Sequence, residues 1–141
     1  MHALVYTGTQ KIDYREEKDP TPKAGEAIIK VQASGICGSD MHAYHGQDER
    51  RSPPLILGHE FSGKVLDGKL KDKNVVVNPL ISCDKCDYCK NDREHLCPNR
   101  TMIGMSTPIK REGGLAELVT APEKNIFEIS KKLNIKHAAL A

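Results

Sequence analysis

Short apolar runs separated by turn residues dominate this chain. In the run from Ala27 to Ala33, the residues Ile29, Val31 and Ala33 alternate with polar neighbours, which is typical of a strand with one buried face. Further runs predict strands at Met1 to Thr7, Leu55 to Leu57, Phe61 to Leu66, Val75 to Ile81, Leu115 to Thr120 and Ile126 to Ile129. Many short strands with Gly- and Pro-containing turns between them indicate a mainly β fold, either a barrel or a sandwich.

Only the last segment predicts a helix from its own pattern. Asn134 is a candidate N-cap, and the residues from Ile135 to Ala141 behind it read as the start of a helix. The chain shows no internal repeat and no low-complexity tract. Its length of 141 residues fits one domain of ordinary size, so we expect a single domain at residues 1–141.

Composition narrows the class of protein. Hydrophobic residues make up 38% of the chain, so it can bury one core. The 21 basic and 19 acidic side chains leave a formal charge of only +2, and aromatic residues make up 4%. Neither nucleic acid nor a membrane surface is therefore an expected partner. Because the N-terminus has no basic leader and no apolar stretch of membrane-spanning length, we expect a cytoplasmic protein.

Four cysteines lie close together in a polar stretch that has too few apolar residues to fold by burial alone. They are Cys83, Cys86, Cys89 and Cys97. Gaps of two residues let neighbouring sulfur atoms converge on one ion, so the spacing predicts a structural zinc site in a lobe at residues 82–100. An iron–sulfur cluster is the main alternative because Pro98 follows the last cysteine, although the gap of seven residues before it is too long. A disulfide is the second alternative.

The fifth cysteine, Cys37, stands far upstream of this cluster between two glycines. Taken alone, it would more often be a buried core thiol than a metal ligand. Three polar residues follow within the next five positions, however, and His59 and Glu60 come after a short apolar run. A thiolate, an imidazole and a carboxylate are the ligand types of a catalytic zinc site with an open position. Both readings of Cys37 stay open at this point.

Taken in order, four motifs carry a family resemblance. The segments GICGSDMH, GHEFSG, CDKCDYCKNDREHLC and GGLAELV resemble the N-terminal catalytic domain of the zinc-dependent medium-chain alcohol dehydrogenases. The branch of sorbitol, threonine and sugar-acid dehydrogenases is the most similar. The resemblance covers nearly the whole chain. It implies a GroES-like, partly open β-barrel with short helices, a catalytic zinc, and a lobe with a structural zinc.

The resemblance also implies a role for each matching position. Cys37 and His59 correspond to the first two ligands of the catalytic zinc. Glu60 corresponds to a glutamate that either binds the metal directly or lies behind it. Consecutive residues of a regular strand face opposite ways, so His59 and Glu60 can both reach one ion only where the backbone bends. Asp40 corresponds to an aspartate that hydrogen-bonds the ligand histidine and so fixes its tautomer.

Two further positions correspond to a path for the proton. The resemblance implies that Ser39 takes a proton from the substrate alcohol and that His42 passes it to solvent. A histidine with an ordinary pKa of about 6.5 can exchange a proton with water at physiological pH. A turn serine and a solvated loop histidine are the alternatives at these two positions.

The chain departs from the family pattern in three ways. It contains no G-x-G-x-x-G motif and no room for a βαβ unit, so the Rossmann domain that would bind NAD or NADP is absent from these residues. A further zinc ligand, expected beyond the helix that begins at Asn134, is also absent, so we expect weaker binding of the catalytic zinc. Finally, the connection from Lys64 to Asn74 is short, which leaves the barrel geometry there in doubt.

These observations predict a catalytic-domain fragment of a zinc-dependent alcohol or polyol dehydrogenase. The full-length enzyme would oxidise a secondary alcohol of a small molecule to a ketone, transfer hydride to NAD or NADP, and form a homo-oligomer. The fragment alone would be inactive. The alternative function is a stand-alone zinc-stabilised binding or scaffold module.

Overall fold

The chain folds mainly into antiparallel sheets. The computed structural model describes residues 1–140. Its strands are β1 (His2–Gly8), β2 (Lys11–Glu16), β3 (Glu26–Ser34), β4 (Leu55–Ile56), β5 (Phe61–Val65), β6 (Asn74–Val77), β7 (Leu80–Ile81), β8 (Thr101–Met102), β9 (Leu118–Pro122) and β10 (Ile126–Glu128). Its helices are α1 (Gly38–Tyr44), α2 (Asp87–Lys90) and α3 (Ile135–Ala138), with the 3-10 turns η1 (Glu94–Leu96) and η2 (Glu123–Asn125). The prediction of a mainly β fold with short helices is confirmed.

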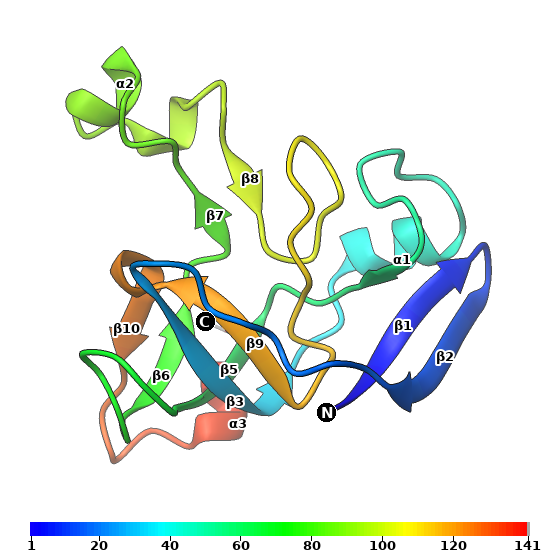
Figure 1. Ribbon diagram of the computed structural model, residues 1–141, viewed down its shortest axis with the longest axis horizontal. Coiled ribbons are helices and arrows are strands. Elements are labelled where there is room, and N and C mark those ends of the chain that lie inside the picture. Colours follow the sequence, from blue (N-terminus) through cyan, green and yellow to red (C-terminus); the bar gives the residue numbers. More distant parts are fainter. Residues whose placement is uncertain (141) are drawn as a thin grey trace.

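Two sheets form the body of the molecule (Figure 1). The three-stranded sheet has the order β2-β1-β4, and the five-stranded sheet has the order β10-β6-β5-β3-β9. A bridge between Ala3 and Ala116 joins β1 to the segment just before β9. Beyond this bridge β9 is an edge strand, so the two sheets separate and the barrel is partly open. All strand pairings within residues 1–140 are antiparallel.

The core follows the alternation seen along the strands. In β3, Ala27 and Ile29 are 1% and 0% exposed, whereas Lys30 between β5 and β9 points to solvent. Phe61, Val65 and other apolar residues of the five-stranded sheet form the largest core cluster together with Ile81 and Ile103 from the base of the lobe. Full burial of one such side chain stabilises the fold by about 1.5–3 kcal/mol.

Close contact between strands explains the glycine in the middle of β5. A Cβ atom at Gly63 would lie 2.3 Å from the carbonyl oxygen of Lys30 in the neighbouring strand. No side chain fits there unless the two strands move apart. The position therefore requires glycine for the pairing of β5 with β3.

The cysteine-rich lobe, residues 82–100, projects from the body on the short strands β7 and β8 (Figure 1). The predicted continuous strand from Val75 to Ile81 is wrong, because the chain leaves the five-stranded sheet at Asn78 and begins a separate strand at Leu80. Pro79 between them lacks an N–H group for the sheet. The side-chain amide of Asn125 donates to the carbonyl oxygens of Asn78 and Leu80 at 2.9 and 2.8 Å, which holds the base of the lobe.

Two elements were not predicted from the hydrophobic pattern. All six residues of β2 are exposed, so this strand has no buried face, and the alternation of Ile12 and Tyr14 with polar neighbours does not correspond to burial. The second element is α1, whose glycine-flanked start reads as a loop. Asp40 at its third position accepts a hydrogen bond from the backbone N–H of Cys37 at 3.0 Å, which caps the helix.

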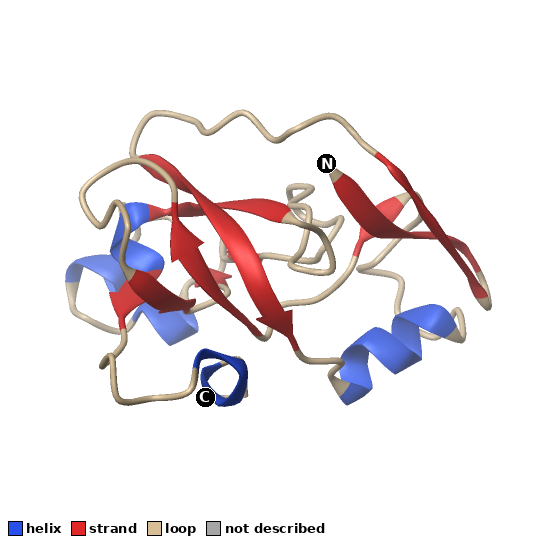
Figure 2. Ribbon diagram, turned by 90° about the horizontal axis from the view of Figure 1, so that it is seen from below, coloured by secondary structure: helices blue, strands red, loops and turns tan. Residues whose placement is uncertain are grey.

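The two remaining expectations concern the C-terminal helix and the short connection. Asn134 caps α3 as predicted, because its side chain accepts a hydrogen bond from the N–H of Lys136 at 2.9 Å. The helix ends at Ala138, and Ala141 lies outside the described residues. Figure 2 shows α3 under the five-stranded sheet and α1 beside the β1–β2 hairpin. The geometry placed in doubt between Lys64 and Asn74 is regular, because these residues pair directly in the β5–β6 ladder.

Candidate metal centres

The four clustered cysteines converge within the lobe. Cys83 follows β7, Cys86 precedes α2, Cys89 lies inside α2, and Cys97 follows η1. Their sulfur atoms all lie within 4.8 Å of one another, and Cys89 Sγ is 3.4 Å from Cys86 Sγ and 4.0 Å from Cys83 Sγ. Four sulfur atoms at about 2.3 Å from one tetrahedral zinc ion would be about 3.8 Å apart. The observed spacing therefore fits a single zinc ion.

The lobe has little else to hold its shape. Only two side chains between residues 82 and 100 are buried, and neither is a large apolar group. The backbone N–H groups of Lys85 and Cys86 lower the pKa of the Cys83 thiol to about 6. Burial and the neighbouring thiols raise the pKa of Cys89 to about 12. All five cysteines are free, and a bound cation would allow the four adjacent thiols to lose their protons together.

A second cluster brings together Cys37, His59 and Glu60, whose candidate ligand atoms lie within 4.8 Å of one another. Cys37 is the N-cap of α1, and the other two residues lie between β4 and β5, outside any regular strand. The backbone of this link bends at Gly58, where φ is +92°. A Cβ atom there would also lie 2.8 Å from the side chain of Leu115. The bend lets two consecutive side chains approach the same thiol.

Asp40 is buried directly behind this cluster and is only 2% exposed. One carboxylate oxygen accepts the N–H of Cys37 at 3.0 Å, and the other accepts the N–H of Gly58 at 3.3 Å. The second oxygen also lies 3.5 Å from Nδ1 of His59. Because this nitrogen is buried against Asp40, Nε2 is the ring nitrogen left for a metal.

Charge around the cluster favours an anionic thiol and an anionic aspartate. The backbone N–H and hydroxyl of Ser39 lower the pKa of the Cys37 thiol. Burial alone would raise the pKa of Asp40, but the neighbouring His59 and the two backbone donors outweigh it and lower that pKa. The Asp40 carboxylate in turn raises the pKa of His59. A thiolate, an imidazole and a carboxylate in reach of one point form a donor set that fits zinc with a position left open.

Comparison with known proteins agrees with this arrangement. Residues 23–131 match the family model described as the alcohol dehydrogenase GroES-like domain. The chain belongs to this family. The GroES-like fold and the dehydrogenase resemblance predicted from the sequence are thereby confirmed.

Relatives of this GroES-like domain include enzymes and solved structures. This chain is 34% identical over 147 residues to the 2-dehydro-3-deoxy-L-galactonate 5-dehydrogenase of Pseudoalteromonas atlantica. The alignment covers 99% of this chain and 42% of that protein. The alcohol dehydrogenase RspB of Escherichia coli CFT073, solved with NADH, superposes with a TM-score of 0.87 at 29% identity, covering 99% and 41% of the two chains.

A cobalt- and zinc-bound thermostable alcohol dehydrogenase from Pyrobaculum aerophilum superposes with a TM-score of 0.86 at 27% identity. The alignment covers 99% of this chain and 44% of that one. The chain therefore spans about two fifths of the length of the relatives it matches.

The two residues expected to carry a proton lie on α1 of the GroES-like domain, three positions apart. Ser39 Oγ accepts a hydrogen bond from Arg51 Nη2 at 3.3 Å. His42 is exposed, and its Nδ1 lies 3.2 Å from Oε1 of Gln47. Ser39 thus lies beside the Cys37 thiol, and His42 lies towards solvent.

Sequence reasoning missed one buried charge beside this site of the GroES-like domain. Arg51 is 2% exposed and donates to the carbonyl oxygen of Gly104 at 3.1 Å, to Asp48 and to Ser39. The available signal was the spacing of three between Asp48 and Arg51, which is lost within a run of charged residues that reads as solvated.

Within residues 1–140, no helix is both long and apolar enough to cross a membrane.

Proposed function

We propose that this chain is the zinc-binding catalytic domain, at residues 1–141, of a dehydrogenase that oxidises a secondary alcohol of a polyol, sugar acid or hydroxy amino acid. The observation that carries the proposal is the convergence of Cys37, His59 and Glu60 on one point, with Asp40 buried behind the histidine. The sequence similarity to a sugar-acid dehydrogenase supports the substrate class.

In this proposal Cys37 and His59 hold the catalytic zinc. Glu60 is the third ligand, which is supported by its carboxylate lying within the same 4.8 Å cluster. Zinc bound there would act as a Lewis acid on the substrate oxygen. Asp40 holds the imidazole of His59 in the tautomer that presents Nε2, and the bend at Gly58 keeps both side chains of the link directed at the thiol.

Ser39 and His42 move the proton of the substrate alcohol. The Ser39 hydroxyl accepts a hydrogen bond from Arg51, which orients it and leaves its own hydrogen available for transfer. His42 lies at the exposed side of α1 and releases the proton to water. The thiols of Cys83, Cys86, Cys89 and Cys97 hold a second, structural zinc in the lobe at residues 82–100.

Hydride transfer in this proposal requires NAD or NADP held by a dinucleotide-binding domain. The 141 residues contain no G-x-G-x-x-G motif, so we expect this piece alone to be inactive. The bound NADH of a similar structure supports the cofactor class. We further propose a cytoplasmic homo-oligomer when the dinucleotide-binding domain is present. Its balanced charge argues against nucleic acid or a membrane as partner.

Metal binding tests this proposal without the cofactor domain. We expect the purified chain to bind about two zinc ions, of which a mild chelator removes one first, because three mixed ligands bind less tightly than four thiolates. Cys37→Ala should abolish the weaker site and leave the stronger, whereas Cys89→Ser should do the reverse. Zinc content by atomic spectroscopy measures both.

The open coordination position is tested by cobalt substitution. In the cobalt-loaded chain, sorbitol or L-threonine should shift the visible absorption bands, and Cys37→Ala should remove the shift. A wild-type chain that retains both ions equally, or cobalt bands that no alcohol changes, would count against the proposed catalytic site.

A further inference from the structure

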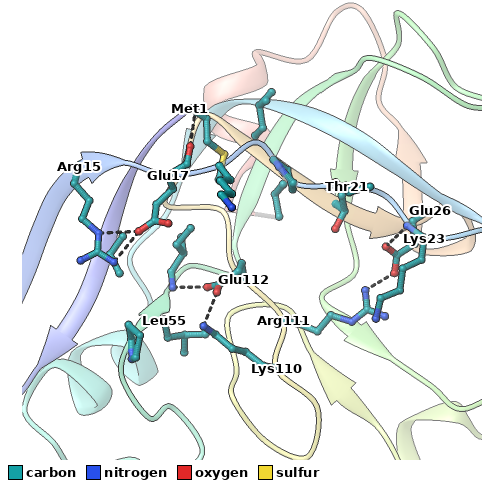
Figure 3. A pocket seen from close by; sticks show the side chains of 18 residues that line it. Met1, Arg15, Glu17, Thr21, Lys23, Glu26, Leu55, Lys110, Arg111 and Glu112 are labelled. Atoms are coloured by element: carbon teal, nitrogen blue, oxygen red, sulfur yellow. Dashed lines mark hydrogen bonds and ion pairs between the residues drawn. The ribbon is translucent and has the colours of Figure 1, made fainter.

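A pocket of about 450 Å³ lies apart from both metal clusters, where the two sheets separate (Figure 3). Its walls come from β1, β4 and the edge strand β9, and the segment 17–23 crosses over it. No cysteine and none of the residues of the Cys37 cluster line it. The volume is within the range of pockets that bind small organic molecules.

The floor of the pocket is apolar. It includes Val5, Ile56 and Val119, which are at most 4% exposed and belong to the core clusters of the two separate sheets. The pocket therefore reaches between the two clusters where the strands do not pair. An alkyl group of a ligand that enters it would lie against these side chains and lose its own contact with water.

The rim of the pocket carries more positive than negative charge. Three ion pairs line it: Arg15 with Glu17, Lys110 with Glu112, and Arg111 with Glu26. Lys18 and Lys23 also line it, and neither forms an ion pair within residues 1–140. The lining thus has two cationic side chains more than it has carboxylates.

One of these two unpaired lysines, Lys23, lies at one end of the pocket. Figure 3 shows it together with Glu26 and Arg111. The carboxylate of Glu26 pairs with Arg111 and accepts the backbone N–H of Lys23, so the ammonium group of Lys23 keeps no partner of its own in the part of the chain that the structure describes. Arg111 is largely buried, with 17% of its side chain exposed, and Glu26 is its only side-chain partner among the described residues. Its guanidinium has five N–H donors and can bind a second carboxylate while keeping the first. This end is therefore suited to a negatively charged group.

We propose that the pocket binds a small organic anion whose carboxylate lies between Lys23 and Arg111 and whose apolar body covers Val5, Ile56 and Val119. A neutral ligand would leave the excess positive charge unbalanced. An inorganic anion would have no apolar part to place against the apolar floor. The carboxylate and the alkyl chain together match both parts of the lining. This site is independent of the proposed dehydrogenase function, since it shares no residue with the metal clusters.

Straight-chain carboxylates of different length carry the same charge, so they separate the contribution of charge to binding from that of apolar burial. We would titrate acetate, butyrate and hexanoate into the zinc-loaded, ¹⁵N-labelled chain and follow the amide signals of Ile56 and Val119 by NMR. Each methylene that enters the pocket should tighten binding by up to about fourfold. Hexanoate should therefore bind most tightly of the three, and more tightly than the neutral hexanol.

Two matched variants test the position of the carboxylate. Lys23→Gln removes an exposed charge at the cationic end and should weaken hexanoate binding by up to about fivefold. Lys131→Gln removes another exposed charge, which does not line the pocket, and it should leave the affinity unchanged.

Each of four results would overturn the proposal. These are the absence of shifts at the two floor amides, hexanol binding as tightly as hexanoate, acetate binding as tightly as hexanoate, and equal affinities in the two lysine variants.

Discussion

Replacing Asp40 by asparagine tests whether this buried carboxylate prepares His59 for a metal. In the native structure its two oxygens accept the N–H groups of Cys37 and Gly58 on opposite sides, and the second oxygen also faces His59 Nδ1 at 3.5 Å. Asparagine has only one acceptor oxygen, so its amide NH₂ must face another donor on one side. Loss of one hydrogen bond to a charged group costs about 1.5–3 kcal/mol of stability.

The effect on the metal should be of similar size. Partners that orient a ligand histidine contribute about 10–100-fold to metal affinity, which corresponds to about 1.4–2.7 kcal/mol. Asp40→Asn should therefore weaken the zinc site at Cys37 by that factor and leave the lobe zinc unchanged. Competition with a fluorescent chelator measures both affinities in one sample, with the lobe as internal reference.

The control variant is Asp67→Asn. Asp67 also accepts a backbone N–H, that of Ile28 at 2.6 Å, but it lies outside both metal clusters. This variant should leave both zinc affinities unchanged. If Asp40→Asn binds zinc at the Cys37 site as tightly as the control does, the positioning role of Asp40 is refuted.

Three further predictions concern stability. Cys89→Ser should make residues 82–100 sensitive to protease even with zinc present, and undiminished resistance would contradict the structural role of the lobe metal. Arg50, beside Asp48, holds the pKa of that carboxyl at about 2 rather than 3.8, so the folded state binds fewer protons. This stabilisation, on the order of 1–2 kcal/mol, is complete above about pH 5 and lost as the pH falls through 2. In Asp48→Asn, the free energy of unfolding measured by urea denaturation should therefore fall less steeply as the pH is lowered below about 5. Gly63→Ala should cost about 3 kcal/mol or more because its Cβ would lie 2.3 Å from a carbonyl oxygen of β3, whereas Gly8→Ala has open space; equal melting temperatures would exclude this contact as the cause.

The sequence predicted the parts of the fold whose local pattern agrees with their burial. β3 is an example, because its alternation matches the exposure of its residues, and α3 is another, because Asn134 caps it. β2 has no buried side chain, so its short alternation of Ile12 and Tyr14 with polar residues does not mark a core face and did not predict the strand. The break at Pro79 was visible as a residue type, but its effect depends on Asn125, which is distant in sequence.

The candidate site, like the fold, was predicted from the sequence only in part. Residue types and motif order singled out Cys37, His59 and Glu60, and the structure places all three together. The need for a bend between β4 and β5 followed from strand geometry, and Gly58 provides it. Arg51 could not be predicted, because a charged residue in a charged run reads as solvated unless its distant partners Ser39 and Gly104 are known.

The order of strands has a consequence for synthesis on the ribosome. Both β1 and β3 pair with the segment 115–122, so neither has its full set of neighbours when it first leaves the ribosome. At about 5–20 residues per second, the edge of β3 waits on the order of 5–20 s for β9. During that interval it exposes backbone groups and apolar side chains that can pair with another nascent chain. A chain that stalls before residue 118 would keep this edge open, so an incomplete product could aggregate through β3.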